Sequence, residues 1–223
     1  MSTTGTDSYL TLEGLSHASL KVLGSKFLAF ALPVASREEA LEAWKRYKRE
    51  FHDATHHCLA YRLIGSPGES RYNDDGEPAG SAGKPILSAI DHAGLKDVAV
   101  VVVRYFGGTK LGMGGLGRAY GDASAGAIAQ GNITRRFISE FLSVAFPHHL
   151  TSPVMRTITE QGAVIVKTSY DESVHLRLEI RQSRVRSLIT ALVDATKGGV
   201  RMEAEPRKPE TPPGTSIVEK EQH

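Results

Sequence analysis

Residues 98–118 of this 223-residue chain read VAVVVVRYFGGTKLGMGGLGR. The first eight of these residues form a nearly continuous apolar run that is rich in β-branched valine, which is typical of a strand buried on both faces. Six glycines then fall within the twelve positions 106–117, and the small residues that follow predict a helix over about residues 117–130. A buried strand, a glycine-rich turn and a helix therefore form the centre of the first half of the chain.

The sequence before this stretch predicts further strands and helices. Ser36 is a good N-cap, and Glu39 completes a capping box, so a helix is predicted from there to residue 51 or 52. Residues 56–64 alternate as a strand, with His57 on one face and with His56 and Cys58 on the other. The other predicted segments are a strand over 26–33, a loop rich in Gly, Pro, Asp and Ser over 66–83, and a helix over about 85–93.

The C-terminal part predicts a second pattern. Strands are expected over residues 137–146, 164–170, 174–181 and 200–204, with one helix ending near residue 161 and another over 183–197. Ser152 as N-cap and Pro153 as first residue give the cleanest start for the first helix. The order β-α-β-β-α-β is that of a ferredoxin-like split βαβ unit. We expect two α+β domains, over residues 1–134 and 135–205, and a flexible tail over 206–223.

Charge and composition exclude several classes of protein. The formal net charge is only +2, and residues 1–130 are neutral, so any nucleic-acid binding needs a local basic patch rather than overall charge. The single cysteine, Cys58, excludes an intramolecular disulfide and an all-cysteine zinc site. The polar first nine residues do not resemble a signal peptide, and the aliphatic run 98–103 is far too short to span a membrane. A cytoplasmic protein without membrane contact is expected.

The glycine-rich turn is the first candidate site. It contains G-x-G-x-x-G at Gly112, Gly114 and Gly117, and such glycines let amide groups approach an anion at a helix N-terminus. A dinucleotide site is disfavoured because no parallel strand follows to complete a βαβ unit. The structural alternative is that the glycines permit a tight turn and close helix–sheet packing. The candidate anion-binding residues are Lys84, Arg104, Gly107, Gly108, Lys110, Gly112, Gly114, Gly115, Gly117 and Arg118.

An acidic loop, defined by Asp74, Asp75 and Glu77, is the second candidate. Its carboxylates are suited to a hard cation or to acid–base catalysis, and the alternative is an Asx turn whose side chains satisfy loop amides. His56 and Cys58 share a strand face, so Cys58 is a candidate nucleophile with His56 as base, against the alternative of a buried, inert thiol. Too few ligands converge for zinc, and we expect neither a metal nor a cofactor.

Two basic patches are candidates for binding RNA phosphates, although a solvated helix face is the commoner meaning of the first. The first patch lies on the outward side of the first predicted helix, and the second lies at a strand–helix junction in the C-terminal part. The residues of the two patches are Lys45, Arg46, Lys48 and Arg49, and Arg177, Arg181, Arg184 and Arg186.

Two stretches resemble the conserved block of the Impact/YigZ family. They are YNDDGEPAGSAGKP at residues 72–85 and VVVRYFGGTKLGMGGLGRAY at residues 101–120. The resemblance implies an N-terminal domain with the fold of the second domain of ribosomal protein S5. It also implies a C-terminal ferredoxin-like domain similar to domain V of elongation factor G. The family's eukaryotic members bind the activator of a stress-responsive initiation-factor kinase and so regulate translation.

Two functions follow as hypotheses. The first is a non-enzymatic cytoplasmic factor linked to translation, which contacts RNA, the ribosome or a protein regulator. The alternative is an enzyme acting on a small molecule or phosphate ligand, whose site joins the acidic loop, Lys84, Arg104 and the glycine-rich turn. Small-molecule kinases on the S5-like fold bind phosphate with a similar Gly-Leu-Gly turn. Here, however, Arg118 and Ala119 replace the serines that those kinases place next.

Overall fold

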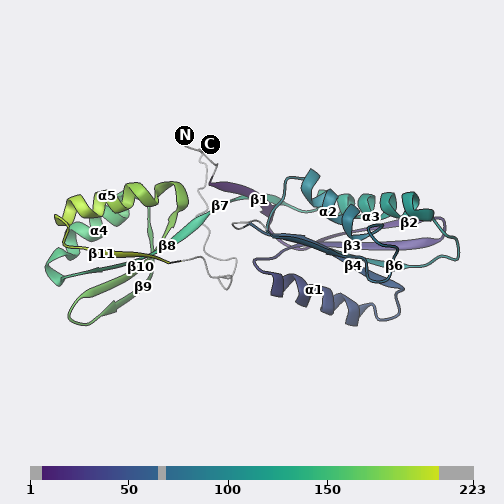
Figure 1. Ribbon diagram of the computed structural model, residues 1–223, viewed down its shortest axis with the longest axis horizontal. Coiled ribbons are helices and arrows are strands. Elements are labelled where there is room, and N and C mark those ends of the chain that lie inside the picture. Colours follow the sequence, from purple (N-terminus) through teal and green to yellow (C-terminus); the bar gives the residue numbers. More distant parts are fainter. Residues whose placement is uncertain (1–6, 65–68, 206–223) are drawn as a thin grey trace. The chain divides into compact units, whose positions relative to one another are not determined.

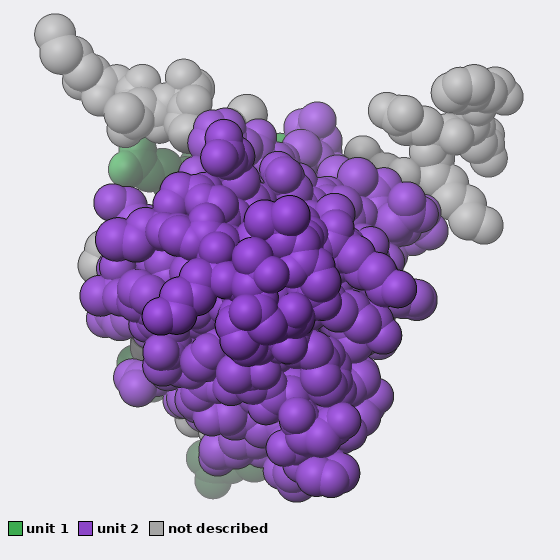
Figure 2. Space-filling model, turned by 90° about the vertical axis from the view of Figure 1, so that its right-hand side faces the viewer, with its two compact units in different colours: residues 1–8, 137–208 green, residues 9–136, 209–223 purple. Residues whose placement is uncertain are grey.

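The computed structural model describes residues 7–64 and 69–205. The described chain divides into two compact units, with residues 7–8 and 137–205 in unit 1 and residues 9–136 in unit 2 (Figures 1 and 2). Each unit combines helices with antiparallel strands, so the expectation of a two-part α+β protein is confirmed. The expected tail at 206–223 lies outside the described residues.

Unit 2 is built on a five-stranded antiparallel sheet with the order β2-β3-β6-β4-β5. A separate two-stranded sheet pairs β1 with β7. Helix α1 covers one face of the large sheet, and α2 and α3 cover the other (Figure 1). The bounds are β1 Ser8–Leu12, β2 Ser16–Val22, β3 Ser25–Pro33, α1 Arg37–Glu50, β4 His56–Arg62, β5 Ser70–Asn73, α2 Gly83–His92, β6 Val98–Tyr105, α3 Gly112–Ala129 and β7 Ile133–Phe137.

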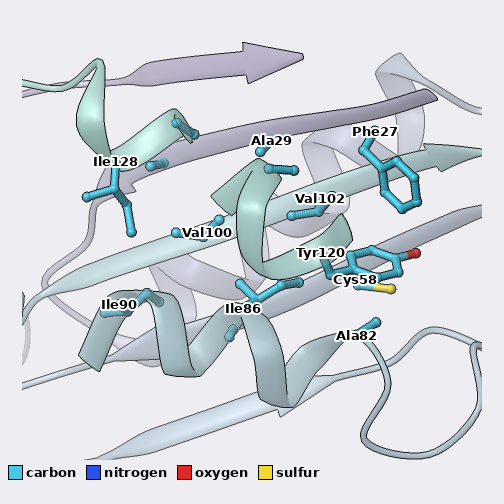
Figure 3. Packing of buried hydrophobic residues seen from close by; sticks show 14 of the residues in the cluster. Phe27, Ala29, Cys58, Ala82, Ile86, Ile90, Val100, Val102, Tyr120 and Ile128 are labelled. Carbon is cyan, nitrogen blue, oxygen red and sulfur yellow. The ribbon is translucent and has the colours of Figure 1, made fainter. Parts of the chain in front are cut away.

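The central strand β6 explains why its sequence lacks polar alternation. Val100 and Val102 pack in the core beneath α2 and α3 together with Ile86 and Tyr120 (Figure 3). The intervening Val101 packs in a second core on the α1 side. Both faces of the strand are therefore apolar, as predicted.

The start of α1 also follows the prediction. The Ser36 hydroxyl accepts a hydrogen bond from the Glu39 amide at 3.2 Å. The Glu39 carboxylate accepts a hydrogen bond from the amide of Ala35, one residue before the N-cap, at 2.7 Å. These bonds satisfy amide groups that the helix itself leaves without partners.

Several predicted bounds are wrong. Helix α3 begins at Gly112 rather than near residue 117, so the second half of the glycine-rich turn is helical. Strands β1, β2 and β5 were not predicted, because they are short or half-exposed and are defined by their sheet partners. In unit 1, α4 begins at Thr151 instead of using Ser152 as its N-cap, and the Thr151 hydroxyl donates to the carbonyl of His148 in a preceding 3₁₀ turn.

Unit 1 has the predicted element order β-α-β-β-α-β. Its sheet order is β11-β8-β10-β9, with all neighbours antiparallel. Both helices lie on one face over a core that includes Phe146, Ile158, Leu178 and Leu188, and the described residues place no helix on the opposite face (Figure 1). The bounds are β8 Ser139–Phe146, α4 Thr151–Glu160, β9 Val164–Tyr170, β10 Val174–Arg181, α5 Val185–Thr196 and β11 Arg201–Glu205.

Candidate functional site

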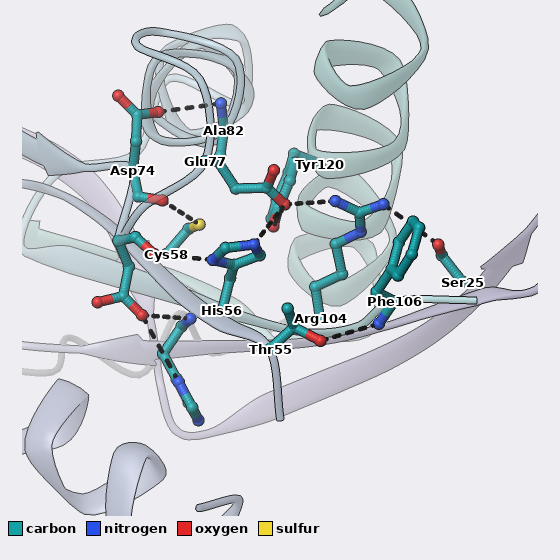
Figure 4. A network of polar contacts seen from close by, with 12 residues as sticks. Ser25, Thr55, His56, Cys58, Asp74, Glu77, Ala82, Arg104, Phe106 and Tyr120 are labelled. Carbon is teal, nitrogen blue, oxygen red and sulfur yellow. Dashed lines mark hydrogen bonds and ion pairs between the residues drawn. The ribbon is translucent and has the colours of Figure 1, made fainter. Parts of the chain in front are cut away.

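Strand pairing brings the acidic loop to the end of the buried strand. Residue His56 of β4 is the register partner of Arg104 of β6, so both side chains lie beside the loop that connects β5 to α2. Figure 4 shows Glu77 of this loop between His56, Arg104 and Tyr120 of α3. Four segments that are distant in the sequence thus meet at one point in unit 2.

The buried polar network at this point consists of Glu77, Arg104, Tyr120 and Ser25. One Glu77 oxygen accepts hydrogen bonds from Arg104 Nη1 and from the Tyr120 hydroxyl, each at 2.7 Å. Arg104 Nη2 donates to Ser25 Oγ at 3.2 Å, and Arg104 Nε is buried without a hydrogen-bond partner among the residues that the structure describes. The side chains of Glu77 and Arg104 are only 3% and 6% exposed, so their charges compensate each other away from water.

Asp74 acts as a structural acceptor. Its carboxylate accepts from the amides of Gly80, Ala82 and Gly83 at 2.8–3.0 Å, and the last of these begins helix α2. The side chain therefore closes the loop and satisfies amide groups at the start of that helix. Asp74 therefore satisfies loop amides, but the Asx turn is made by Asn73, whose side chain accepts from the amide of Asp75.

Asp75 ties the acidic loop to α1 and β4. Its carboxylate accepts from Lys48 Nζ and from the His57 amide, both at 2.7 Å. The residue has φ 45°, in the left-handed region, and its amide donates to the Asn73 side chain at 2.8 Å. Asp75 is thus held from three sides, and Lys48 is an anchor for the loop.

His56 and Cys58 lie on the same face of β4, as predicted, and both contact the acidic loop. His56 Nδ1 is 2.8 Å from the Asp75 carbonyl, and His56 Nε2 is 3.9 Å from the Glu77 carboxylate. The Cys58 thiol donates to the Asp74 carbonyl at 3.0 Å. Burial raises the pKa of this thiol and outweighs the opposing effect of the Tyr120 hydroxyl, so Cys58 stays protonated at neutral pH.

The glycine-rich turn is in close contact with the turn between β2 and β3. A Cβ atom on Gly107 would lie 1.9 Å from the backbone carbon of Gly24, so only glycine fits there. The Gly107 amide donates to Ser25 Oγ at 3.1 Å, which links the turn to the buried polar network. Gly108 and Gly112 have positive φ values, 84° and 68°, and an added Cβ on either, or on Gly114, would meet open space.

The remaining anion-binding candidates are more loosely placed. The first turn of α2 carries Lys84, which is exposed and has no hydrogen bond or ion pair with the described residues. Lys110 and Arg118 are also exposed, one before α3 and one in its second turn. A Cβ on Gly115 would come within 3.2 Å of the Leu111 side chain, and one on Gly117 within 3.6 Å of Pro85, so both glycines pack closely.

The two predicted basic patches differ in how far their charges are already engaged. In α1, Lys48 pairs with Asp75, Arg49 lies 3.3 Å from Glu42, and Arg46 hydrogen bonds to the Tyr47 hydroxyl, whereas Lys45 is exposed. In unit 1, two arginines lie over aromatic rings and two are exposed in and after a 3₁₀ turn. The first two are Arg177 over Phe141 and Arg181 over Phe137, and the other two are Arg184 and Arg186.

Sequence reasoning did not identify Ser25 and Tyr120 as parts of the network. Ser25 begins β3, and Tyr120 lies in the third turn of α3, far from the acidic loop in sequence. Within residues 7–64 and 69–205, no group of three or more His, Cys, Asp and Glu side chains is arranged to hold a metal ion. No helix in the same ranges is long and apolar enough to cross a membrane.

Comparison with known proteins identifies the family of this chain. The Impact N-terminal domain model matches residues 23–128, and a domain of unknown function (DUF1949) matches residues 144–198. The IMPACT family member YigZ of Escherichia coli (strain K12) is 31% identical over 181 residues, which cover 80% of this chain and 88% of YigZ. The chain belongs to the IMPACT family. The resemblance seen in residues 72–85 and 101–120 is therefore confirmed.

Other IMPACT family relatives cover a similar extent of the chain. The member YvyE of Bacillus subtilis (strain 168) is 28% identical over 191 residues, or 86% of this chain and 88% of YvyE. A crystal structure of a hypothetical protein superposes with a TM-score of 0.70 and 28% identity, and covers 91% of this chain and 100% of that one. The two-unit α+β architecture is thus shared with a solved structure.

Proposed function

We propose that this IMPACT family protein is a non-enzymatic factor that acts in translation by binding RNA or the ribosome. The link to translation rests on the family, whose eukaryotic members regulate that process. We also propose that unit 2 has the S5 domain 2-like fold and that unit 1 is ferredoxin-like. The sheet order β11-β8-β10-β9 and the helices on one face support the second assignment.

The observation that carries the binding proposal is the basic end of unit 2, defined by Lys21, Lys26 and Lys110. Lys21 pairs with Lys26 across β2 and β3, and Lys26 pairs with Tyr105 at the end of β6, directly before the glycine-rich turn. All three lysines are exposed. Because residues 1–130 are neutral overall, these three cations at one end of unit 2 supply the local patch that the composition requires.

The start of α3 supports the same assignment. Helix α3 has 18 residues, its N-cap Leu111 makes no side-chain capping bond, and its first turn holds no acidic residue. The first amide groups of a helix lack intrahelical partners and favour an anion. Lys110 precedes the N-cap Leu111, so a phosphate group at this end of the helix gains both a cation and amide donors.

The enzyme hypothesis has less support. Asp74, Asp75 and Glu77 each accept two or three hydrogen bonds from the protein, which stabilise the loop and the helix that follows it. Cys58 is a buried, protonated thiol and therefore a poor nucleophile. The arrangement of these residues therefore fits a structural role better than a catalytic one.

Ribosome co-sedimentation across a salt series tests the proposal. Charge reversal of Lys21, Lys26 and Lys110 to Glu is expected to weaken binding at least tenfold and to reduce its salt dependence. The matched control reverses Lys45, Arg46 and Arg49 on α1, where two of the three side chains already have protein partners. Equal losses for both triple variants, or no sedimentation of the wild-type protein at low salt, would refute the proposal.

A further inference from the structure

The face of the unit 1 sheet opposite α4 and α5 contains a hollow of about 450 Å³, to which all four strands contribute. Its small side chains are Ser143 and Ala145 on the central strand β8 and Ser169 on the edge strand β9. Long polar side chains also line the hollow. They are Lys167 on β9, His175 and Arg177 on β10, and Arg201 and Glu203 on β11.

Strand register arranges these residues in two rows. One row runs Arg201, Ala145, His175 and Ser169 from β11 to β9. The parallel row runs Glu203, Ser143, Arg177 and Lys167. The hollow lies over β8, because Ala145 and Ser143 there are short, whereas β11 on one side and β10 on the other carry long side chains.

The electrostatic character of the hollow is cationic. Lys167, Arg177 and Arg201 carry permanent charges, and Glu203 is the one carboxylate among its lining residues. Lys167 and Arg201 are exposed and form no ion pair with the described part of the chain. The hollow is therefore suited to an anion, and the exposed Ser169 hydroxyl adds a hydrogen-bond donor.

The spacing of the cations favours an extended polyanion over a single phosphate. Lys167 and Arg201 lie on the two edge strands, three inter-strand steps apart, which corresponds to roughly 14 Å between their backbones. A single phosphate is small compared with this separation, so it would contact both cations only if both long side chains extended toward the centre of the sheet. Successive phosphates of one extended strand can follow the diagonal from Arg201 over Ala145 and then between His175 and Arg177 to Lys167.

We propose that this cationic hollow of unit 1 binds the phosphate backbone of single-stranded RNA, a second contact that rests on the proposed function. Binding here depends on phosphates rather than on base stacking, because Phe141 on this face is buried beneath Arg177 and the His175 ring is engaged by the Asp171 carboxylate at 3.1 Å. The expected binding is therefore strongly salt-dependent and nearly independent of base sequence.

The test measures binding of a fluorescein-labelled 12-nucleotide poly(U) RNA to the full chain by anisotropy over a salt series. We expect Lys167→Glu/Arg201→Glu to weaken binding at least tenfold and to reduce the slope of log K against log salt by about 1.4, since each lost contact removes about 0.7. The matched control, Arg156→Glu/Arg186→Glu, makes the same charge change on α4 and α5 and is expected to bind within threefold of wild type.

A second variant tests the hollow without changing charge. Ala145→Leu fills the hollow and is expected to weaken poly(U) binding at least fivefold, with the far-ultraviolet circular dichroism spectrum unchanged.

A 12-nucleotide poly(U) should bind at least tenfold more tightly than an RNA hairpin with a fully paired stem, and inorganic phosphate should not compete at equal phosphate concentration. Preference for the hairpin, competition by phosphate, or unchanged binding by Ala145→Leu would overturn the assignment.

The outcomes separate this inference from the function on which it rests. If Lys167→Glu/Arg201→Glu binds poly(U) as wild type does while the triple variant of the basic end loses ribosome binding, the hollow is not a site and the proposed function stands. If the wild-type chain binds neither ribosomes nor poly(U) at low salt, both proposals fail. Equal loss in the α4–α5 control also overturns the hollow, because net charge alone would then explain binding.

Discussion

The ion pair between Glu77 and Arg104 offers the sharpest test of the buried polar network. The substitution Glu77→Gln removes one charge while keeping nearly the same shape, and it leaves a buried guanidinium uncompensated. Breaking a buried pair in this way costs about 3–5 kcal/mol. We expect a value near the lower end, about 3 kcal/mol, because the glutamine oxygen still accepts from Arg104 and from the Tyr120 hydroxyl.

The control is an ion pair of the same chemistry in water. Glu42 and Arg49 of α1 lie 3.3 Å apart with side chains 65% and 66% exposed, so Glu42→Gln is expected to cost less than about 1 kcal/mol. Adding Arg104→Met to Glu77→Gln removes the unpaired charge and should recover part of the lost stability.

Urea unfolding followed by tryptophan fluorescence measures these effects in the relevant unit. The sole tryptophan, Trp44, lies in α1 of unit 2, and its indole donates to the His57 carbonyl. The signal therefore reports on the unit that contains the ion pair, even if the two units unfold separately. If Glu77→Gln and Glu42→Gln lower the free energy of unfolding by amounts within about 0.5 kcal/mol of each other, the argument from burial is refuted.

Three further predictions concern the same region. Gly107→Ala should lower the free energy of unfolding by more than about 2 kcal/mol, because its Cβ would lie 1.9 Å from the backbone carbon of Gly24. Gly114→Ala, whose Cβ would meet open space, should leave the free energy of unfolding unchanged or raise it, and urea titration distinguishes the two variants. Asp74→Ala, which removes the acceptor of three amides, should cost about 1–3 kcal/mol and speed proteolysis of the acidic loop. Cys58 should resist iodoacetamide in the native state. Since burial raises its pKa, the folded state holds this proton more tightly, so stability should fall as pH rises above about 8.5, and less so in Cys58→Ala.

Much of the fold follows from local sequence patterns. The unbroken apolar run of β6 requires cover on both faces, and α1 on one side with α2 and α3 on the other provide it. The capping box at Ser36 and the alternation of β4 also hold in the structure. Strands β2 and β5 were missed because their partly exposed residues lack a strong pattern, and pairing with β3 and β4 determines them.

The candidate site was predictable only in part. The acidic loop, His56 and Arg104 were singled out from residue type, and the structure brings them together. Their partner Tyr120 carries no sequence signal, because an aromatic residue in a helix of small residues also suits the core. The roles also differ from the catalytic expectation: the acidic side chains accept hydrogen bonds from the protein itself.

The sequence alone determined the positions of the main helices and strands, the division into two α+β parts and the family, because hydrophobic periodicity, capping residues and motifs are local properties of the chain. Tertiary structure alone decided which charges are paired. It placed Glu77 against Arg104, engaged most of the α1 patch, and left Lys167 and Arg201 at opposite edges of one sheet. These positions depend on strand order and register, and neither is encoded in the spacing of residues along the chain.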